Sequence, residues 1–508
     1  MDFGEYPMMI ARSGRMAFTT STLTIVTNAC LFLLPSFISK KLTKVSSTDK
    51  TKLPTTEKTR TPSTEKITGI PALDGLRGLA CLFVFNEHLT YNLTQTFLYG
   101  YGVDDRRFMV QFPFLRIPWS GFSMVAIFYV ISGYVLSYKP LRLMRAGDDA
   151  AVHKTLVSSI FRRGLRLYLP PFAAVLICGF LIWAGVFQAA TTVFEHENNY
   201  MGLHEPIPPR LDTLISQMYD ALKNACNMLK IWDWASRSIS AGHYDLHTWT
   251  IVIEIRSSMA LFLLLAATAR LKHWCRLLVV VLFAFFCVAT DREDVLLFTS
   301  GMLVAEIDMM RKHRGTSISL PGLPIRDVRK SSLEGAVWLM MFIAGLFFAS
   351  TATVGGDSTP GYRILSELVP ACFSDRAAFL RAIGAVLTTW SVANSRLLEP
   401  IFTNSLASYL GKISFALYLV HGNVLKTIGY MAMPVIYAIT GDGTRAGQST
   451  DGIVKAWVLM VLAVVPLTFW VADIFWRAVD IPCVRFARWL EGVMTNTGDD
   501  GYTKIAHA

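Results

Sequence analysis

The feature that most constrains this chain is a series of apolar runs, each long enough for a helix to cross a lipid bilayer. Such a helix needs about 20 mostly apolar residues, and runs of this length recur from residue 76 onward in a chain of 508 residues. The predicted spans are 76–95, 120–138, 167–189, 248–268, 275–290, 294–310, 334–354, 377–394, 412–438 and 455–478. They predict an all-α integral membrane protein, a bundle of about ten transmembrane helices with no soluble catalytic domain.

The composition agrees with a membrane protein and excludes several other classes. Apolar residues make up 53% of the chain and charged residues 17%, whereas soluble domains carry about 25% charged residues. Eight cysteines are too few for a disulfide-rich scaffold of this length. The net charge is +11, and the basic residues gather at the ends of apolar runs. We therefore expect a lipid bilayer, and no nucleic acid, as partner.

The distribution of basic residues predicts how the helices cross. Residues 40–66 hold eight Lys/Arg against three Asp/Glu, and residues 139–166 hold seven against two. The long segment 190–246 has seven acidic against four basic residues. Basic loops remain on the cytoplasmic side, so ten spans with both tails in the cytoplasm satisfy the pattern. The sequence does not indicate which membrane holds the protein.

The chain divides into a membrane domain and two tails. Residues 1–68 form an N-terminal tail whose apolar segment 17–39 could span the membrane, lie at its surface or act as a signal-like segment. The rest of this tail is a Lys-, Thr- and Pro-rich linker that cannot bury a core. Residues 69–490 are the predicted membrane domain, and residues 491–508 form a short C-terminal tail.

Ionisable residues inside the predicted spans are candidates for function, because burying them in lipid is costly. Arg77 and His88 are eleven residues apart, about 16 Å of helix rise on nearly the same face. His88, Glu254 and His421 are predicted at a similar depth on three helices, where a histidine beside a carboxylate can act as a general base. Either histidine could instead be structural, and Glu254 could pair with an arginine such as Arg256. The sequence contains no P-loop, GxSxG or HExxH motif and no metal-ligand spacing.

Five patches along the chain resemble the acyltransferase-3 family of integral membrane O-acyltransferases, in its fungal branch. The patches are DGLRG at 74–78 followed by His88, IFYVISGYVL at 127–136, FRRGLRLYLPP at 161–171, HTWTIVIE at 247–254 and LGKISFALYLVH at 410–421. The chain departs from the bacterial pattern after Glu254, where Ile255 and Arg256 replace an acid and a glutamine, and Phe415 replaces the common tyrosine.

The resemblance implies an enzyme that moves an acyl group, most often acetyl, from acyl-CoA to a hydroxyl. Acyl-CoA would be a co-substrate, with no permanently bound cofactor and no metal. The acceptor would be a hydroxylated small natural product, as in secondary metabolite biosynthesis, or a glycan. Intramembrane His and Glu would also suit a multi-pass secondary transporter, which is the competing hypothesis.

The resemblance also implies roles for particular residues. His88 would be the general base, oriented by Glu254 or Asp74, although a covalent acyl-histidine stays possible. Basic side chains at the inner mouth would bind the CoA phosphates: Arg77, Arg162, Arg163 and Arg166. Hydroxyl or indole groups would stabilise the oxyanion: Ser132, Tyr134 and Trp249. Tyr418 and His421 are further candidates for the site.

Overall fold

The computed structural model describes residues 32–36, 38, 70–200, 202–232, 242–316 and 328–495. The predicted apolar segment 17–39 lies outside the described residues except for its last few positions, and so does the linker that follows it. Residues 496–508 of the predicted C-terminal tail also lie outside. Residues 70–495, where the apolar runs were found, are described except for three short gaps.

The described chain is built from helices. The main helices are α3 (Pro71–Tyr91), α4 (Gly121–Ala146), α5 (Asp149–Trp183), α8 (Leu214–Cys226), α9 (Trp249–Ala267), α10 (His273–Ala289), α11 (Glu293–Thr316), α12 (Val328–Ala349), α14 (Arg376–Asn394), α16 (Ser405–Val424), α17 (Tyr430–Thr440), α18 (Thr450–Phe475) and α19 (Ile481–Met494). Within the described ranges, the β-type backbone pairing is limited to one isolated bridge between Tyr99 and Val354. Each of the ten predicted runs overlaps one of these helices, which confirms the all-α prediction.

Four helices are long and apolar enough to cross a membrane, judged by length and composition among the described residues. They are Gly121–Ala146, Asp149–Trp183, Leu246–Ala267 and the continuous helix Thr450–Met494, and two further apolar helices are shorter. The continuous helix joins α18 to α19 through a π-helical turn, η8 (Trp476–Asp480). A second π-helical turn, η7 (Leu425–Gly429), joins α16 to α17. Such turns often occur at functional sites, because they redirect the side chains that follow.

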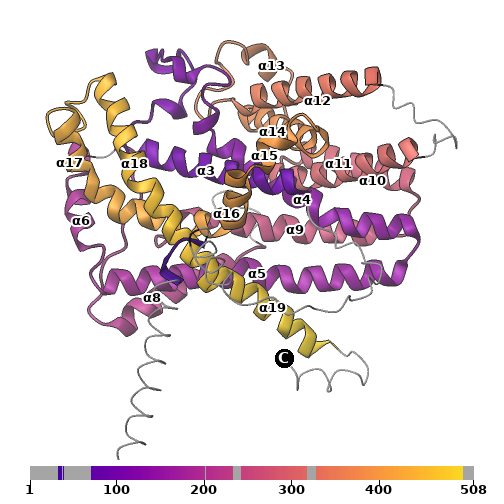
Figure 1. The fold of residues 1–508 in the computed structure, drawn as a ribbon, viewed down its shortest axis with the longest axis horizontal. Helices are drawn as coiled ribbons and strands as arrows, with labels where there is room; N and C mark the ends of the chain where they lie inside the picture. Colours follow the sequence, from indigo (N-terminus) through magenta and orange to yellow (C-terminus); the bar gives the residue numbers. More distant parts are fainter. Residues whose placement is uncertain are drawn as a thin grey trace, which may run out of the picture.

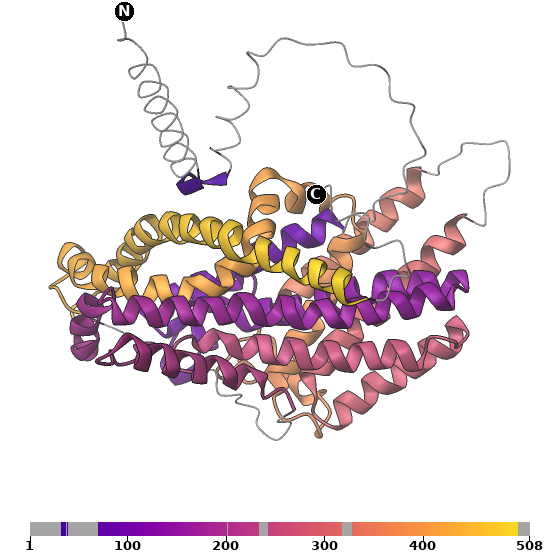
Figure 2. The same cartoon turned by 90° about the horizontal axis from the view of Figure 1, so that it is seen from below.

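The helices α3, α4, α5 and α9 run in roughly the same direction across the molecule, and α18 with α19 crosses them obliquely (Figure 1). Seen from below, α5 extends along most of the length of the bundle (Figure 2). The most extensive packing joins α4 to α11, α16 to α3 and α12 to α14. One contiguous apolar core fills the space between these pairs.

Two glycines allow α3 and α16 to approach closely. A Cβ atom at Gly78 would collide with the backbone of Gly411, and one at Gly411 would collide with the backbone of Asp74. Helix α16 begins at a fixed point because the Asn404 side chain accepts a hydrogen bond from the Ala407 amide at 2.9 Å. The glycine contact and this cap together set the height at which α16 faces α3.

Candidate functional site

Three histidines from different parts of the chain form a compact cluster inside the bundle. His88 lies on α3, His421 lies on α16, and His247 lies in the turn Leu246–Thr248 that leads into α9. His88 Nδ1 is 2.9 Å from His421 Nε2. The ring of His247 lies 4.1 Å from that of His88 and 4.3 Å from that of His421, measured between centroids. His88 and His421, for which the sequence predicted only a similar depth on different helices, are thus in direct contact.

The hydrogen bonds of this pair assign the protons on both rings when they are neutral. His421 Nδ1 is 2.7 Å from the Tyr418 carbonyl oxygen, and a carbonyl only accepts, so this nitrogen carries a hydrogen. His421 Nε2 is then the acceptor, and His88 Nδ1 donates to it. The remaining lone pair of His88 is on Nε2. The chain from the Tyr418 carbonyl through His421 to His88 thus presents Nε2 as a basic nitrogen.

His247 is held between two carboxylates. Its Nε2 lies 3.0 Å from Glu205 Oε1, and its Nδ1 lies 3.1 Å from Asp245 Oδ1. Tyr91 also donates its hydroxyl hydrogen to Glu205 Oε1 at 2.7 Å. Asp245 further accepts from the His247 backbone amide. These bonds use both ring nitrogens of His247 and fix the orientation of its ring beside His88.

Glu205 lies in the connecting segment before α8 and carries a negative charge into this cluster. Burial alone would raise the pKa of Glu205, but the neighbouring His247, with the Lys426 ammonium, holds this pKa well below its ordinary value. Lys426 Nζ is 4.0 Å from Glu205 Oε2 and donates to the Tyr244 carbonyl at 2.7 Å. Lys426 belongs to the π-helical turn η7, which directs its buried ammonium toward the cluster.

A cavity of about 220 Å³ lies between α3, α4, α5, α9 and α16. Its lining includes the basic residues Arg77, Arg163, Arg166 and Lys412 and the acidic residues Glu254 and Asp480. Along α16, Lys412 precedes Tyr418 by six residues, about 9 Å of helix rise. The cavity therefore extends from a basic region near Lys412 to an apolar region around Tyr418.

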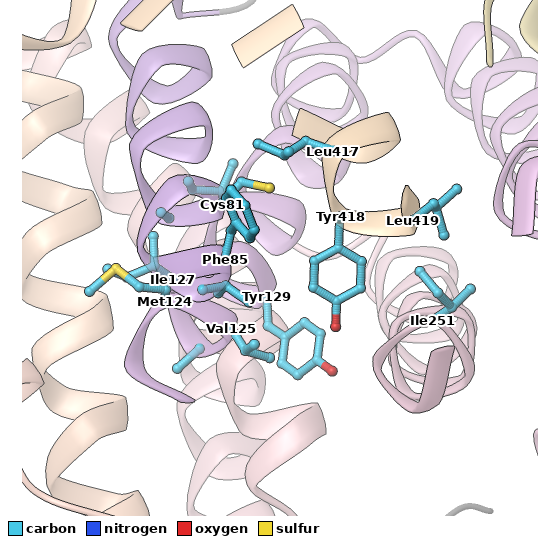
Figure 3. Packing of buried hydrophobic residues seen from close by; sticks show 14 of the residues in the cluster. Cys81, Phe85, Met124, Val125, Ile127, Tyr129, Ile251, Leu417, Tyr418 and Leu419 are labelled. Atoms are coloured by element: carbon cyan, nitrogen blue, oxygen red, sulfur yellow. The ribbon is translucent and has the colours of Figure 1, made fainter. Parts of the chain in front are cut away.

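Tyr418 separates this cavity from the histidines. Tyr418, Tyr129 and Ile251 all line the cavity, and Figure 3 shows them on three different helices. The Tyr418 hydroxyl donates to the His247 carbonyl at 3.1 Å and accepts from Thr250 Oγ1 at 2.8 Å. The Tyr418 ring also lies 5.6 Å from the His421 ring, between centroids. Tyr418 thus lines the cavity while its hydroxyl is bonded to the His247 backbone.

The structure corrects the predicted place of Glu254. Its Oε1 atom bonds to Arg163 at 2.7 Å and to Ser132 at 3.0 Å. The carboxylates that contact an imidazole of the cluster are those of Glu205 and Asp245. Equal depth on two helices does not bring side chains together, because the direction in which each points around its helix also matters. Asp74, the alternative orienting acid, instead pairs with Arg77 at 3.1 Å.

The other predicted residues fall into two groups. Ser132 and Tyr418 line the cavity together with Arg77, Arg163 and Arg166. Tyr134 lies elsewhere, because its hydroxyl donates to the buried Asp308 at 3.1 Å. Trp249 does not line the cavity and packs near Phe122. Two of the three residues predicted to stabilise the oxyanion, Tyr134 and Trp249, therefore do not line the cavity.

Arg162 is also outside the cavity lining, and its Nε pairs with Glu491 at 3.1 Å. Sequence reasoning missed the carboxylates that hold His247, Glu205 and Asp245, because they lie outside the apolar runs. The Asp-x-His spacing of Asp245 and His247 is the signal that could have indicated this pair. Lys412 and Asp480 were also missed; Lys412 is the first residue of the predicted span 412–438, and Asp480 lies just after the predicted span 455–478.

The three imidazoles offer ring nitrogens within 4.8 Å of one another, so a metal ion has to be considered. Every ring nitrogen of the cluster except His88 Nε2 has a hydrogen-bonding or ion-pair partner among the described residues. A metal ion at this cluster would have to displace the hydrogen bonds, and any protons, of the nitrogens that it ligated. These hydrogen bonds and ion pairs hold the three rings in the orientations described above.

Comparison with known proteins supplies the family. The Acyl_transf_3 family model, an acyltransferase domain, matches residues 70–477. The chain is 32% identical to O-acetyltransferase PaAT-1 of Phomopsis amygdali, over 82% of this chain and 83% of that protein. It is 25% identical to acyltransferase clz18 of Cochliobolus lunatus, over 73% and 85% of the two chains. An acyltransferase of Phoma sp. is 26% identical over 70% and 83%.

No solved structure matches this chain. The family match begins just before α3 and ends within η8. It covers the three histidines of the cluster and every residue that lines the cavity except Asp480. The chain therefore belongs to the acyltransferase-3 family, and it is a membrane-associated acyltransferase.

Proposed function

We propose that the protein is a multi-pass O-acyltransferase that moves an acyl group, acetyl in the first instance, from acyl-CoA to a hydroxyl of a small molecule. A glycan hydroxyl is the second acceptor class. The relatives support this proposal, because PaAT-1 is named as an O-acetyltransferase. The single observation that carries the mechanism is the bond from His88 Nδ1 to His421 Nε2, which leaves His88 Nε2 as the basic nitrogen.

The membrane arrangement that we propose has about ten crossings and both tails in the cytoplasm. The ten apolar runs overlap helices of the structure, and basic clusters alternate with them as cytoplasmic loops do. In this arrangement the cavity region near Lys412 faces the cytoplasm, where acyl-CoA is found. His88 lies deeper in the bundle, because it follows Arg77 by eleven residues of α3, about 16 Å.

In the proposed reaction, His88 acts as a general base. The acceptor oxygen forms a bond to the thioester carbonyl carbon while its proton passes to His88 Nε2. The carbon–sulfur bond then breaks, and His88 returns this proton to the CoA sulfur. His421 stabilises the imidazolium that forms in between, because its Nε2 keeps accepting from His88 Nδ1, as a carboxylate does in a catalytic triad.

Tyr418 lies between the cavity and the histidines, so it also has a part in this scheme. With the donor in the cavity, the thioester lies against the Tyr418 ring. The ring must turn aside for the acyl carbon to reach the acceptor beside His88. The bonds from Tyr418 to Thr250 and the His247 carbonyl hold the ring in the closed position until then.

The test is comparative mass spectrometry of native-host extracts, wild type against His88→Gln. Gln is close in size to His and cannot take a proton, so insertion and folding should be kept. We expect a compound to lose the mass of one acyl group while its free hydroxyl precursor accumulates. Unchanged acylated compounds would remove His88 as the base. A changed distribution of the same compounds between cells and medium would favour transport instead.

A further inference from the structure

Helix α8 packs along the C-terminal part of α5, a helix long and apolar enough to span a membrane (Figure 1). The side chain of Arg210, just before α8, approaches Gly185, just after α5. In the middle of α8, Ala221 lies so close to Gly179 of α5 that a Cβ atom there would be 2.8 Å from the Ala221 Cβ. The two helices therefore run antiparallel. Since Gly179 lies four residues, about 6 Å, before the end of α5, the middle of α8 lies at a depth inside the span.

The side of α8 that faces α5 is fixed by small residues and by hydrogen bonds. Ala221 and Ala225 are buried on this side. Gln217 is buried as well, and its Nε2 donates to the Tyr244 hydroxyl at 2.7 Å. The Tyr244 hydroxyl in turn donates to Asp220 Oδ2 at 2.8 Å. These contacts hold α8 in one rotation about its axis, so the direction of its other faces is also fixed.

A different face of α8 is apolar and uncovered. Ile215, Tyr219, Leu222 and Cys226 follow one another at i, i+4, i+7 and i+11, which places them on one side of a helix. Ile215 is 82% exposed, Tyr219 70% and Leu222 46%, and Cys226 is exposed too. Large apolar side chains that gather on one surface mark an interaction site, whereas single exposed ones do not.

We propose that α8 is a re-entrant helix embedded in the outer half of the bilayer, and that the face of Ile215, Tyr219 and Leu222 binds lipid acyl chains. The inference rests on the proposed membrane arrangement and not on the acyl-transfer reaction. It places part of the acidic segment 190–246 inside the membrane. The helix has 13 residues, about 20 Å of rise, which is too short to cross a hydrocarbon core of about 30 Å and long enough to enter one leaflet.

The surroundings of α8 favour lipid as the occupant. The same stretch of α5 exposes Ile177 by 43% and Phe180 by 48%, as a spanning helix does where it faces lipid. Lys223 is compatible with this position, because helical side chains tilt toward the N-terminus, which in α8 is the outer end, and a lysine can extend its ammonium to the headgroups. The start of α8 is capped, since Thr213 Oγ1 accepts from the Ser216 amide at 3.1 Å.

The experiment uses purified full-length protein in liposomes of palmitoyl-oleoyl phosphatidylcholine. The photoreactive amino acid benzoylphenylalanine is placed at one position at a time, and the mass of the intact protein is measured after irradiation. In place of Tyr219 or Leu222 we expect it to form phospholipid adducts. Phe180 of the spanning helix α5 is the positive control. Asp357, an exposed residue of the connecting segment between α12 and α14, is the aqueous control and should give several-fold less adduct.

A second measurement needs no substitution, because Cys226 and Cys372 are both exposed thiols. A membrane-impermeant maleimide is added to the protein in lipid nanodiscs, where both membrane faces are accessible, and the labelled peptides are identified by mass spectrometry. Cys372, which precedes α14 in a connecting segment, should be labelled several-fold faster than Cys226. After unfolding in detergent the two thiols should be labelled at similar rates.

Three results would overturn the inference, and they can be told apart. A covalent dimer formed from position 219 or 222, in place of a phospholipid adduct, would identify a second copy of the chain as the occupant. Equal labelling of Cys226 and Cys372, together with no phospholipid adduct at 219 or 222, would place α8 in water. If Phe180 gave no phospholipid adduct either, the proposed membrane arrangement itself would be contradicted.

Discussion

Replacement of His421 tests how much of the catalysis depends on the orientation of His88. In the structure His421 Nε2 is the acceptor that fixes the hydrogen of His88 on Nδ1. His421→Leu removes this acceptor and leaves a buried N–H without a partner, which costs about 1–3 kcal/mol. At 1.4 kcal/mol for each factor of ten, the productive tautomer falls by about 5- to 150-fold. We expect kcat to fall within the same range.

The assay follows acetyl transfer by the purified protein to the acceptor that the His88→Gln comparison identifies. His421→Gln is the matched control, because its side-chain carbonyl can accept from His88 Nδ1. It should keep more activity than His421→Leu, while KM for acetyl-CoA stays the same in both. His88→Gln sets the lower limit, since loss of a general base itself costs about 10²- to 10⁴-fold.

Two results would refute this reasoning. If His421→Leu keeps kcat within twofold of the wild type, the bond between the two histidines does not orient the base. If His421→Leu and His421→Gln lose the same activity, acceptance of the His88 hydrogen is not the relevant property of residue 421. In either case the orienting group would have to be sought at His247, the other ring beside His88.

Three further predictions concern stability. Gly411→Ala should lower the free energy of unfolding by about 1–3 kcal/mol through overpacking, measured by thermal unfolding; Gly164→Ala, at a site with open space, should not lower it. The pKa of Glu205 is lower in the folded protein than its ordinary value of about 4.3. The ionised carboxylate therefore stabilises the fold above this pH, and this stability is lost as pH falls. Glu205→Gln should flatten the acid side of the melting profile, and an unchanged profile would contradict the ion pair with His247. Tyr418→Phe removes two hydrogen bonds and should cost about 1–3 kcal/mol; an unchanged melting temperature would show that they are not needed.

The helical architecture could be predicted from sequence because one physical rule determines it. In lipid every backbone polar group has to be satisfied within its own segment, so an apolar run of about 20 residues becomes a helix. All ten predicted runs accordingly overlap helices of the structure. The predicted boundaries differ from the observed ones where a helix extends beyond its apolar residues. Helix α5, for example, begins at Asp149, well before the apolar run that starts at residue 167.

The candidate site was predicted only as far as depth along a helix allows. Depth placed His88 and His421 at one level, and the structure joins them at 2.9 Å. Depth could not show the direction of Glu254, whose carboxylate faces Arg163 and Ser132. Glu205 was not considered because it lies in a connecting segment, and chain folding alone brings it to His247.

The basic residues show a similar limit. A run such as Arg162, Arg163 and Arg166 predicts positive charge at the inner mouth, but it does not show which charges are already neutralised. The partners Glu491 and Glu254 lie far away in sequence. Only the folded structure therefore separates Arg166, for which no ion pair with a described residue is found, from its two neighbours.

The measurement that tests the central claim most directly is transfer of an isotope-labelled acetyl group by purified protein in lipid vesicles. Acetyl-CoA and the identified hydroxyl compound are the only reactants, and the wild type is compared with His88→Gln. The account predicts one labelled ester formed for each CoA released by the wild type, and a rate at least about 10²-fold lower for His88→Gln. Equal rates in the two proteins, or release of CoA without a labelled ester, would contradict it.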